Sequence, residues 1–122
     1  MARYKFINVN PLGKIEEDCV CRAISLALNI DYNIINHKLH LIGELYDCEF
    51  LCKSCYGCLL DNVFNLDRIE SFNGIPISEF VEMAPKGTFI IRVEGHLTCV
   101  IDNQIYDTWD CGNELIDTIW EV

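Results

Sequence analysis

The spacing of apolar residues changes at about Gly87, and this change limits the folds open to the chain. Between Asp18 and Gly87 the apolar residues recur mainly at intervals of three and four, the period of an amphipathic helix. After Gly87 come four segments rich in β-branched and aromatic residues, separated by glycine, aspartate and asparagine, as in antiparallel strands. Helices followed by strands predict an α+β domain, with the helices packed on one face of a C-terminal antiparallel sheet.

Capping and turn residues divide the first two thirds of the chain into elements. A short strand is expected over residues 4–9, and the first helix is predicted to begin at Asp18, a favourable N-cap. Residues 31–55 predict either one long helix or two shorter ones, with Gly43 as the candidate break. Residues 76–87 predict a short helix opened by proline or serine and closed by proline and glycine.

Length and composition set the class of protein. The chain has 122 residues, enough for one hydrophobic core, so we expect a single domain over residues 1–122. A hydrophobic content of 51% argues against disorder, and the apolar runs are far shorter than the ~20 residues of a membrane span. Since the N-terminus shows no export signal, we expect a cytoplasmic protein whose eight cysteines are free thiols, metal ligands or a catalytic thiolate.

The charge balance bears on the partners. Nine basic and nineteen acidic residues give a net charge of −10, which repels the phosphate backbone of nucleic acids. A basic peptide or protein surface would be attracted instead. We therefore expect a polypeptide substrate or a host protein as the partner, and neither nucleic acid nor membrane.

The segment EEDCVCRAISLAL carries two cysteines at the predicted start of the first helix. Cys19 directly follows the expected cap, where the positive end of the helix dipole and free backbone N–H groups favour a thiolate. Cys21 lies roughly 200° further round the helix, so the two thiols cannot face the same cleft. Glu16, Glu17 and Asp18 oppose ionisation of a neighbouring thiol. Cys19 is therefore the candidate nucleophile, provided that a cation lies near it.

His96 and Asp107 are the candidates for a base and for the carboxylate that orients it. His96 opens the predicted strand HLTCVI, where a side chain can stand at the edge of a sheet. If residues 102–103 form a two-residue hairpin turn, Thr98 pairs with Asp107. Asp107 then shares a face with His96 at a diagonal of ~7 Å, which an imidazole and a carboxylate can bridge. With Cys19 they supply a nucleophile, a base and an orienting group in the chain order Cys, His, Asp.

Two segments, EDCVCRAISLAL and KGTFIIRVEGHLTCVIDNQIYDTWDCG, carry a family resemblance. They resemble small papain-like cysteine peptidases of bacterial and bacteriophage genomes, which are distantly related to bacteriocin-leader peptidases. The resemblance implies a papain-like fold, in which the helix bearing the nucleophile packs on a small antiparallel sheet. It also implies Cys19 as nucleophile, His96 as general base and Asp107 as the residue that orients His96.

The resemblance implies acyl transfer on a polypeptide. The thiolate would attack a peptide or isopeptide carbonyl, the imidazole would protonate the leaving amine, and water would release the acyl enzyme. Deamidation, or transfer to another amine, would use the same atoms. The alternative is a catalytically inactive protein of the same fold that only binds, such as a bacteriophage accessory protein that captures a host factor.

One feature of papain-like enzymes is missing from the sequence. Many of them supply an oxyanion-stabilising amide side chain several residues before the nucleophile, and no glutamine stands there in this chain. Asn8 and Asn10 are the amides available upstream. Asn10 is the candidate donor, together with the backbone N–H of Cys19, because a tetrahedral oxyanion needs preorganised donors.

A second run of cysteines consists of Cys48, Cys52, Cys55 and Cys58. On a continuing helix the first three would form one apolar stripe, and we favour this interpretation. Four thiolates also suit structural zinc, which is the alternative, although zinc sites usually have two C-x-x-C pairs on separate turns. Apart from that alternative, no cofactor is expected.

Overall fold

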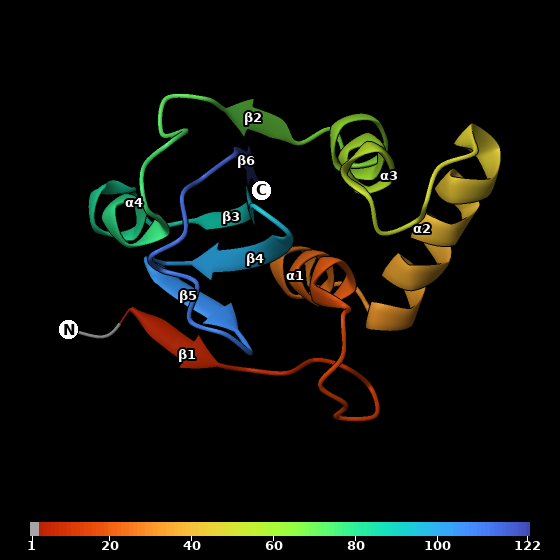
Figure 1. The fold of residues 1–122 in the computed structure, drawn as a ribbon, viewed down its shortest axis with the longest axis horizontal. Helices are drawn as coiled ribbons and strands as arrows, with labels where there is room; N and C mark the ends of the chain where they lie inside the picture. The colour runs from red at the N-terminus through yellow and green to blue at the C-terminus, as the bar shows by residue number, and fades with distance from the viewer. Residues whose placement is uncertain (1–2) are drawn as a thin grey trace.

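The computed structural model describes residues 3–122, which form one sheet with helices on both sides (Figure 1). No helix in residues 3–122 has the length and apolar character needed to cross a membrane. The mixture of helices with a mainly antiparallel sheet agrees with the predicted class. The elements are, in chain order, β1 (Tyr4–Phe6), α1 (Cys19–Leu28), α2 (Tyr32–Tyr46), α3 (Lys53–Cys58), a π-helical turn (Leu59–Val63), β2 (Asp67–Ile69), α4 (Ile77–Met83), β3 (Thr88–Val93), β4 (His96–Ile101), β5 (Gln104–Asp107) and β6 (Thr118–Glu121).

The strands are ordered β1–β5–β4–β3–β6–β2 across the sheet, which differs from a simple C-terminal meander. Hairpins connect β3 to β4 and β4 to β5, but β6 crosses back to pair with the free edge of β3. The N-terminal β1 runs parallel to β5, and β2 covers β6. Strands from three parts of the chain therefore build this sheet, and β1 and β2 form its two edges.

The hairpin between β4 and β5 has the predicted register. Asp102 and Asn103 form its turn with positive φ angles of 45° and 65°, as a type I′ turn requires. Ile101 pairs with Gln104, so the pairing continues toward the end of β5 as the sequence indicated. This register places Asp107, the last residue of β5, near the beginning of β4.

Apolar residues pack in two layers, one on each face of the sheet. On one face, Ile24 of α1 and Leu39 of α2 pack in a cluster with Ile90 of β3. On the other face, Phe80 of α4 packs in a cluster with Phe89 of β3. Neighbouring residues of a strand point to opposite faces, and here both are apolar. The prediction that all helices cover one face is therefore wrong for α4.

The helical segment after Asp31 consists of two helices, and the break does not fall at Gly43. The carboxylate of Asp31 caps α2 by accepting a hydrogen bond from the N–H of Asn33 at 3.0 Å. α2 continues through Gly43, where an added Cβ would lie 2.9 Å from the carbonyl oxygen of Cys48. Gly43 therefore permits the close approach of the following loop. Since α2 ends at Tyr46, the second run of cysteines does not lie on a continuing helix.

Candidate active site

Cys19 and His96 line the same cleft. α1 packs against β4, which brings the first residue of the helix to the first residue of the strand. The cleft has a volume of about 810 Å³ and is also lined by Cys52, Arg92 and Trp109. Its size lies within the range of clefts that bind ligands.

The surroundings of the Cys19 thiol favour its ionised form. Burial alone would raise the pKa of Cys19, but hydrogen bonds with the His96 side chain and the backbone of Leu97 outweigh this effect. The positive charges of His96 and Arg22 act in the same direction, and the pKa is lowered from the ordinary value of 9.0. The acidic residues before Cys19 oppose its ionisation, and the side chains of His96 and Arg22 supply the positive charge that offsets them.

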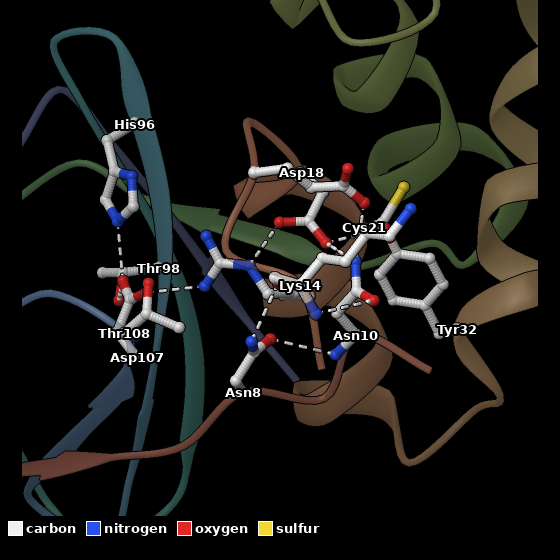
Figure 2. Close-up of polar contacts among 12 residues, drawn as sticks. Asn8, Asn10, Lys14, Asp18, Cys21, Tyr32, His96, Thr98, Asp107 and Thr108 are labelled. Carbon is white, nitrogen blue, oxygen red and sulfur yellow. Dashed lines mark hydrogen bonds and ion pairs between the residues drawn. The ribbon is translucent and has the colours of Figure 1, made fainter. Parts of the chain in front are cut away.

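His96 is held between the cleft and a buried carboxylate. Its Nε2 lies 2.6 Å from Oδ2 of Asp107, and because an ionised carboxylate only accepts, Nε2 carries the proton (Figure 2). Nδ1 is then the ring nitrogen that can exchange a proton with a thiol. Burial would lower the pKa of His96, but hydrogen bonds with Asp107, Cys111 and Cys19 raise it to about 11. The ring of Trp109 meets the imidazole edge to face, with centroids 4.8 Å apart.

Asp107 is almost completely buried, and both of its oxygens are hydrogen-bonded. Oδ2 accepts a second hydrogen bond from the hydroxyl of Thr98 at 2.6 Å, as Figure 2 shows. Oδ1 accepts from Nη1 of Arg22 at 2.9 Å and from the backbone N–H of Thr108 at 2.7 Å. Burial would raise the pKa of Asp107, but the hydrogen bonds from His96 and Thr98 outweigh it and lower the pKa. The carboxylate is therefore ionised and fixed in orientation.

The polar contacts continue from Asp107 into α1. Nε of Arg22 donates to Oδ1 of Asp18 at 2.7 Å, so the guanidinium bridges two carboxylates. Oδ2 of Asp18 accepts from Nδ2 of Asn10 at 2.9 Å and from the hydroxyl of Tyr32 at 2.7 Å. Charged groups of alternating sign thus run from the imidazole in β4, through β5, to the beginning of α1.

Asn10 belongs to these polar contacts and does not reach the cleft. Its Nδ2 donates to Asp18 and, at 2.7 Å, to Oε1 of Glu16, so both amide hydrogens are in use. The amide of Asn8 donates to the carbonyl of Lys14 at 2.9 Å. With its amide bonded to two acids, Asn10 has no free N–H for an oxyanion in this arrangement, and the predicted oxyanion role of Asn10 stays a prediction.

Cys21 lies away from the cleft, as its position on the helix predicted. It is 1% exposed, and its Sγ lies 3.5 Å from Oδ1 of Asn36 on α2. Burial and the negative charge of Asp18 raise the pKa of Cys21 to about 12. Of the two cysteines at the start of α1, Cys19 alone lines the cleft with the imidazole.

Three of the four cysteines in the second run come together. The sulfurs of Cys48, Cys52 and Cys55 lie within 4.8 Å of one another, and Cys48 and Cys55 form a disulfide. Cys52 is a free thiol, and Cys58 lies outside the group, with its sulfur 3.6 Å from Nδ2 of Asn62. The predicted helical stripe is therefore wrong, and so is the expectation that every cysteine is a free thiol, a metal ligand or a catalytic thiolate. Three sulfurs at this separation could bind a metal ion once the disulfide is reduced.

The sequence pattern did not single out Arg22 or Thr98. Arg22 lies four residues after Asp18 and three after Cys19, so it shares a side of the helix with both. A lone arginine among the apolar residues of CVCRAISLAL was the available signal. The hairpin register set Thr98 opposite Asp107, but the sequence pattern did not assign its hydroxyl as a hydrogen-bond donor to that carboxylate.

Comparisons of the chain with models of known protein families, with curated proteins and with solved structures return no match. The resemblance to papain-like peptidases therefore stays a prediction from the residues. Function must be inferred from the geometry around Cys19 and His96.

Proposed function

We propose that the protein is a papain-like cysteine hydrolase that attacks a peptide or isopeptide carbonyl. The observation that carries the proposal is that Cys19 and His96 line one cleft, with Oδ2 of Asp107 2.6 Å from Nε2 of the imidazole. These groups correspond to a nucleophile, a base and an orienting carboxylate. A cysteine that only fills the core would need neither the imidazole nor access to the cleft.

The pKa directions support a thiolate paired with an imidazolium at neutral pH. The pKa of Cys19 is lowered and that of His96 is raised to about 11, so the proton resides on the ring. The thiolate forms a C–S bond to the carbonyl carbon, and the imidazolium gives its proton to the leaving amine as the C–N bond breaks. The neutral ring then takes a proton from water, which attacks the thioester, forms the carboxylic acid and releases the thiolate. Deamidation would use the same steps with ammonia as the leaving group, and transfer would use a second amine in place of water.

Backbone N–H groups at the start of α1 are the donors available to the oxyanion. Within the described part of the chain, Asp18 precedes the helix but makes no side-chain capping bond to it, because its carboxylate is bonded to Arg22, Asn10 and Tyr32. The N–H of Cys19 and those that follow it are therefore not covered by their own cap residue. Such donors stabilise the charge that develops on a tetrahedral intermediate.

Selective alkylation tests the proposal. The protein would be treated with iodoacetamide at pH 6, and the labelled cysteines identified by mass spectrometry of peptides. We expect stoichiometric labelling of Cys19 and its loss in His96→Ala. His37→Ala is the matched control, because His37 is exposed on α2. Equally slow labelling of all free thiols would contradict the hydrolase.

A binding protein of the same fold is the second candidate. The commitment of the Asn10 amide to Glu16 and Asp18 favours it, since no side-chain amide is then held for the oxyanion by the loop before Cys19. Such a protein would capture a polypeptide partner without turnover. Equal, slow labelling of its thiols would support this candidate over the hydrolase.

The group of Cys48, Cys52 and Cys55 supports a structural zinc site as an addition to either candidate. Three thiolates are ligands that zinc prefers, and their sulfurs already lie within 4.8 Å of one another. Zinc would require reduction of the disulfide, because only thiolates coordinate the ion. Native mass spectrometry of the reduced protein tests this, with bound zinc expected in the wild type and absent when Cys52 and Cys55 are changed to serine.

A further inference from the structure

We infer that Arg22 is a positioning residue of the proposed active site, which fixes Asp107 behind His96 and ties β5 to the helix that carries Cys19. The inference rests on the proposed hydrolase function. It assigns to Arg22 an effect on the reactivity of the nucleophile in addition to any effect on folding.

The two oxygens of Asp107 have separate partners. Oδ2 faces His96 at 2.6 Å and Thr98 at 2.6 Å, whereas Oδ1 faces Arg22 at 2.9 Å and the N–H of Thr108 at 2.7 Å. A carboxylate can rotate about its Cβ–Cγ bond unless both oxygens are held. Without Arg22, a single backbone N–H would hold Oδ1, and Oδ2 would be less firmly directed at the imidazole.

The shape of the guanidinium allows it to hold two carboxylates at once. Nη1 contacts Asp107 and Nε contacts Asp18 at 2.7 Å, so one planar group joins the end of β5 to the beginning of α1. Arginine presents its donors in a rigid fork, whereas lysine is a compact point charge on a flexible stem. A lysine at position 22 would keep the positive charge but lose the fixed bridge.

The three charged side chains of the bridge between Asp18 and Asp107 are buried. Arg22 is 8% exposed, Asp18 7% and Asp107 3%. Charges removed from water must be paired closely, and each of these has a partner of opposite sign. The same guanidinium also acts on the nucleophile, because its charge helps to lower the pKa of Cys19.

The molecule contains a matched pair outside the site. Arg68 donates to Asp61 through Nη2 at 2.7 Å and through Nε at 3.1 Å, and both side chains are about a third exposed. This pair lies beside Trp120 and does not line the cleft of Cys19. Arg68 therefore offers an arginine–aspartate control that shares the chemistry of Arg22 but not its position.

The test compares the pH profile of Cys19 alkylation in the wild type, Arg22→Lys, Arg22→Met and Arg68→Lys. We expect Arg22→Lys to raise the midpoint of the profile by about one pH unit, which slows alkylation by up to about tenfold at pH values below the wild-type midpoint. Arg22→Met, which also removes the charge, should slow it further. Arg68→Lys should change the rate by less than about twofold.

The outcomes separate positioning from folding. A merely structural Arg22 would lower the melting temperature of Arg22→Lys while leaving the midpoint for the folded protein unchanged, and this result would overturn the inference. If the changes at position 22 prevent folding, Asp18→Asn keeps Arg22 but weakens one end of its bridge. Loss of the negative charge beside Cys19 would by itself lower the midpoint. A raised midpoint in a folded Asp18→Asn would therefore support the inference, and an unchanged or lowered midpoint would count against it.

The same assay separates the inference from the hydrolase proposal. If His96→Ala does not slow alkylation of Cys19, the hydrolase proposal fails. If His96→Ala abolishes alkylation while Arg22→Lys and Asp18→Asn leave the midpoint unchanged, only the role of Arg22 fails.

Discussion

The start of α1 and the segment between α2 and α3 are both rich in cysteine, but their sulfurs have different neighbours. Cys19 meets an imidazole, and a buried guanidinium lies near it. Cys52 lines the same cleft but lies beside two other sulfurs, which are bonded to each other. The same residue type is therefore placed for nucleophilic attack in one region and for cross-linking or metal binding in the other. Charged partners, more than spacing along the chain, decide which chemistry a cysteine can perform.

The largest expected difference between the two regions is in the rate at which their cysteines are alkylated. At pH 6 we expect Cys19 to react first, ahead of Cys21 and of Cys52, the free thiol of the other region. With a pKa of about 12 in place of 9.0, Cys21 carries about a thousandfold less thiolate than an ordinary cysteine. Time-resolved labelling followed by peptide mapping measures the order. Faster labelling of Cys52 than of Cys19 would reverse the comparison.

Replacing one carboxylate near each region should lower the free energy of unfolding by clearly different amounts. Asp107→Asn leaves the His96 imidazolium buried without its anion and Arg22 with one of its two carboxylates, and we expect it to lower the free energy of unfolding by about 3–5 kcal/mol. Asp117 pairs with Lys53 of α3 at 2.9 Å, but its side chain is 44% exposed. Asp117→Asn should therefore cost about 1 kcal/mol or less. Urea denaturation measures both, and equal costs would contradict the distinction.

The cross-link should contribute stability without affecting the nucleophile. Cys48→Ser opens a disulfide between residues seven positions apart, and we expect a loss of about 2 kcal/mol in the free energy of unfolding. Cys58→Ser is the matched control, because Cys58 is a free thiol in the same segment. Its expected cost is about 0.5 kcal/mol or less. A change in Cys19 alkylation caused by Cys48→Ser would show that the two regions are coupled.

The pH dependence of stability should be the smallest effect, because two contributions cancel. The contribution of His96 is complete below its unfolded pKa of 6.5 and is lost as pH rises toward about 11. That of Cys19 is complete above 9.0 and is lost as pH falls through its lowered pKa. Above pH 6.5 and above the lowered pKa of Cys19, up to pH 9.0, the folded protein holds one proton on the ring and the unfolded chain holds one on the thiol. We therefore expect stability in the wild type to be nearly flat with respect to these groups.

Replacing Cys19 with serine should reveal a pH dependence of stability that is cancelled in the wild type. In Cys19→Ser only the contribution of His96 remains, so stability should fall with rising pH by about 1 kcal/mol per unit above pH 6.5. Denaturant unfolding at pH 6.5, 7.5 and 8.5 measures the slope. Cys52→Ser, which removes a thiol from the other region, should remain as flat as the wild type. Equal slopes for the two variants would mean that Cys19 and His96 do not share a proton.

Local chemistry in the sequence was sufficient for the part of the site that lies on one hairpin. The dipeptide at residues 102–103 fixed the type of turn, the turn fixed the register, and the register set Asp107 near His96. The acids before Cys19 likewise marked the beginning of α1. These features depend on turn geometry and on neighbours a few residues apart, so a short segment contains all the information that they need.

Only the tertiary structure decided how distant segments meet. The pairing of β6 with β3, the packing of α4 on the second face and the grouping of three sulfurs each depend on surfaces that form when the chain folds. Arg22 bonds to a carboxylate 85 positions away, and the amide of Asn10 is bonded to two acids outside the cleft. A buried charge takes the partner that packing brings within hydrogen-bond distance. The order of residues determines which reactive side chains this protein carries. The packing of α1 against β4 determines which of them touch.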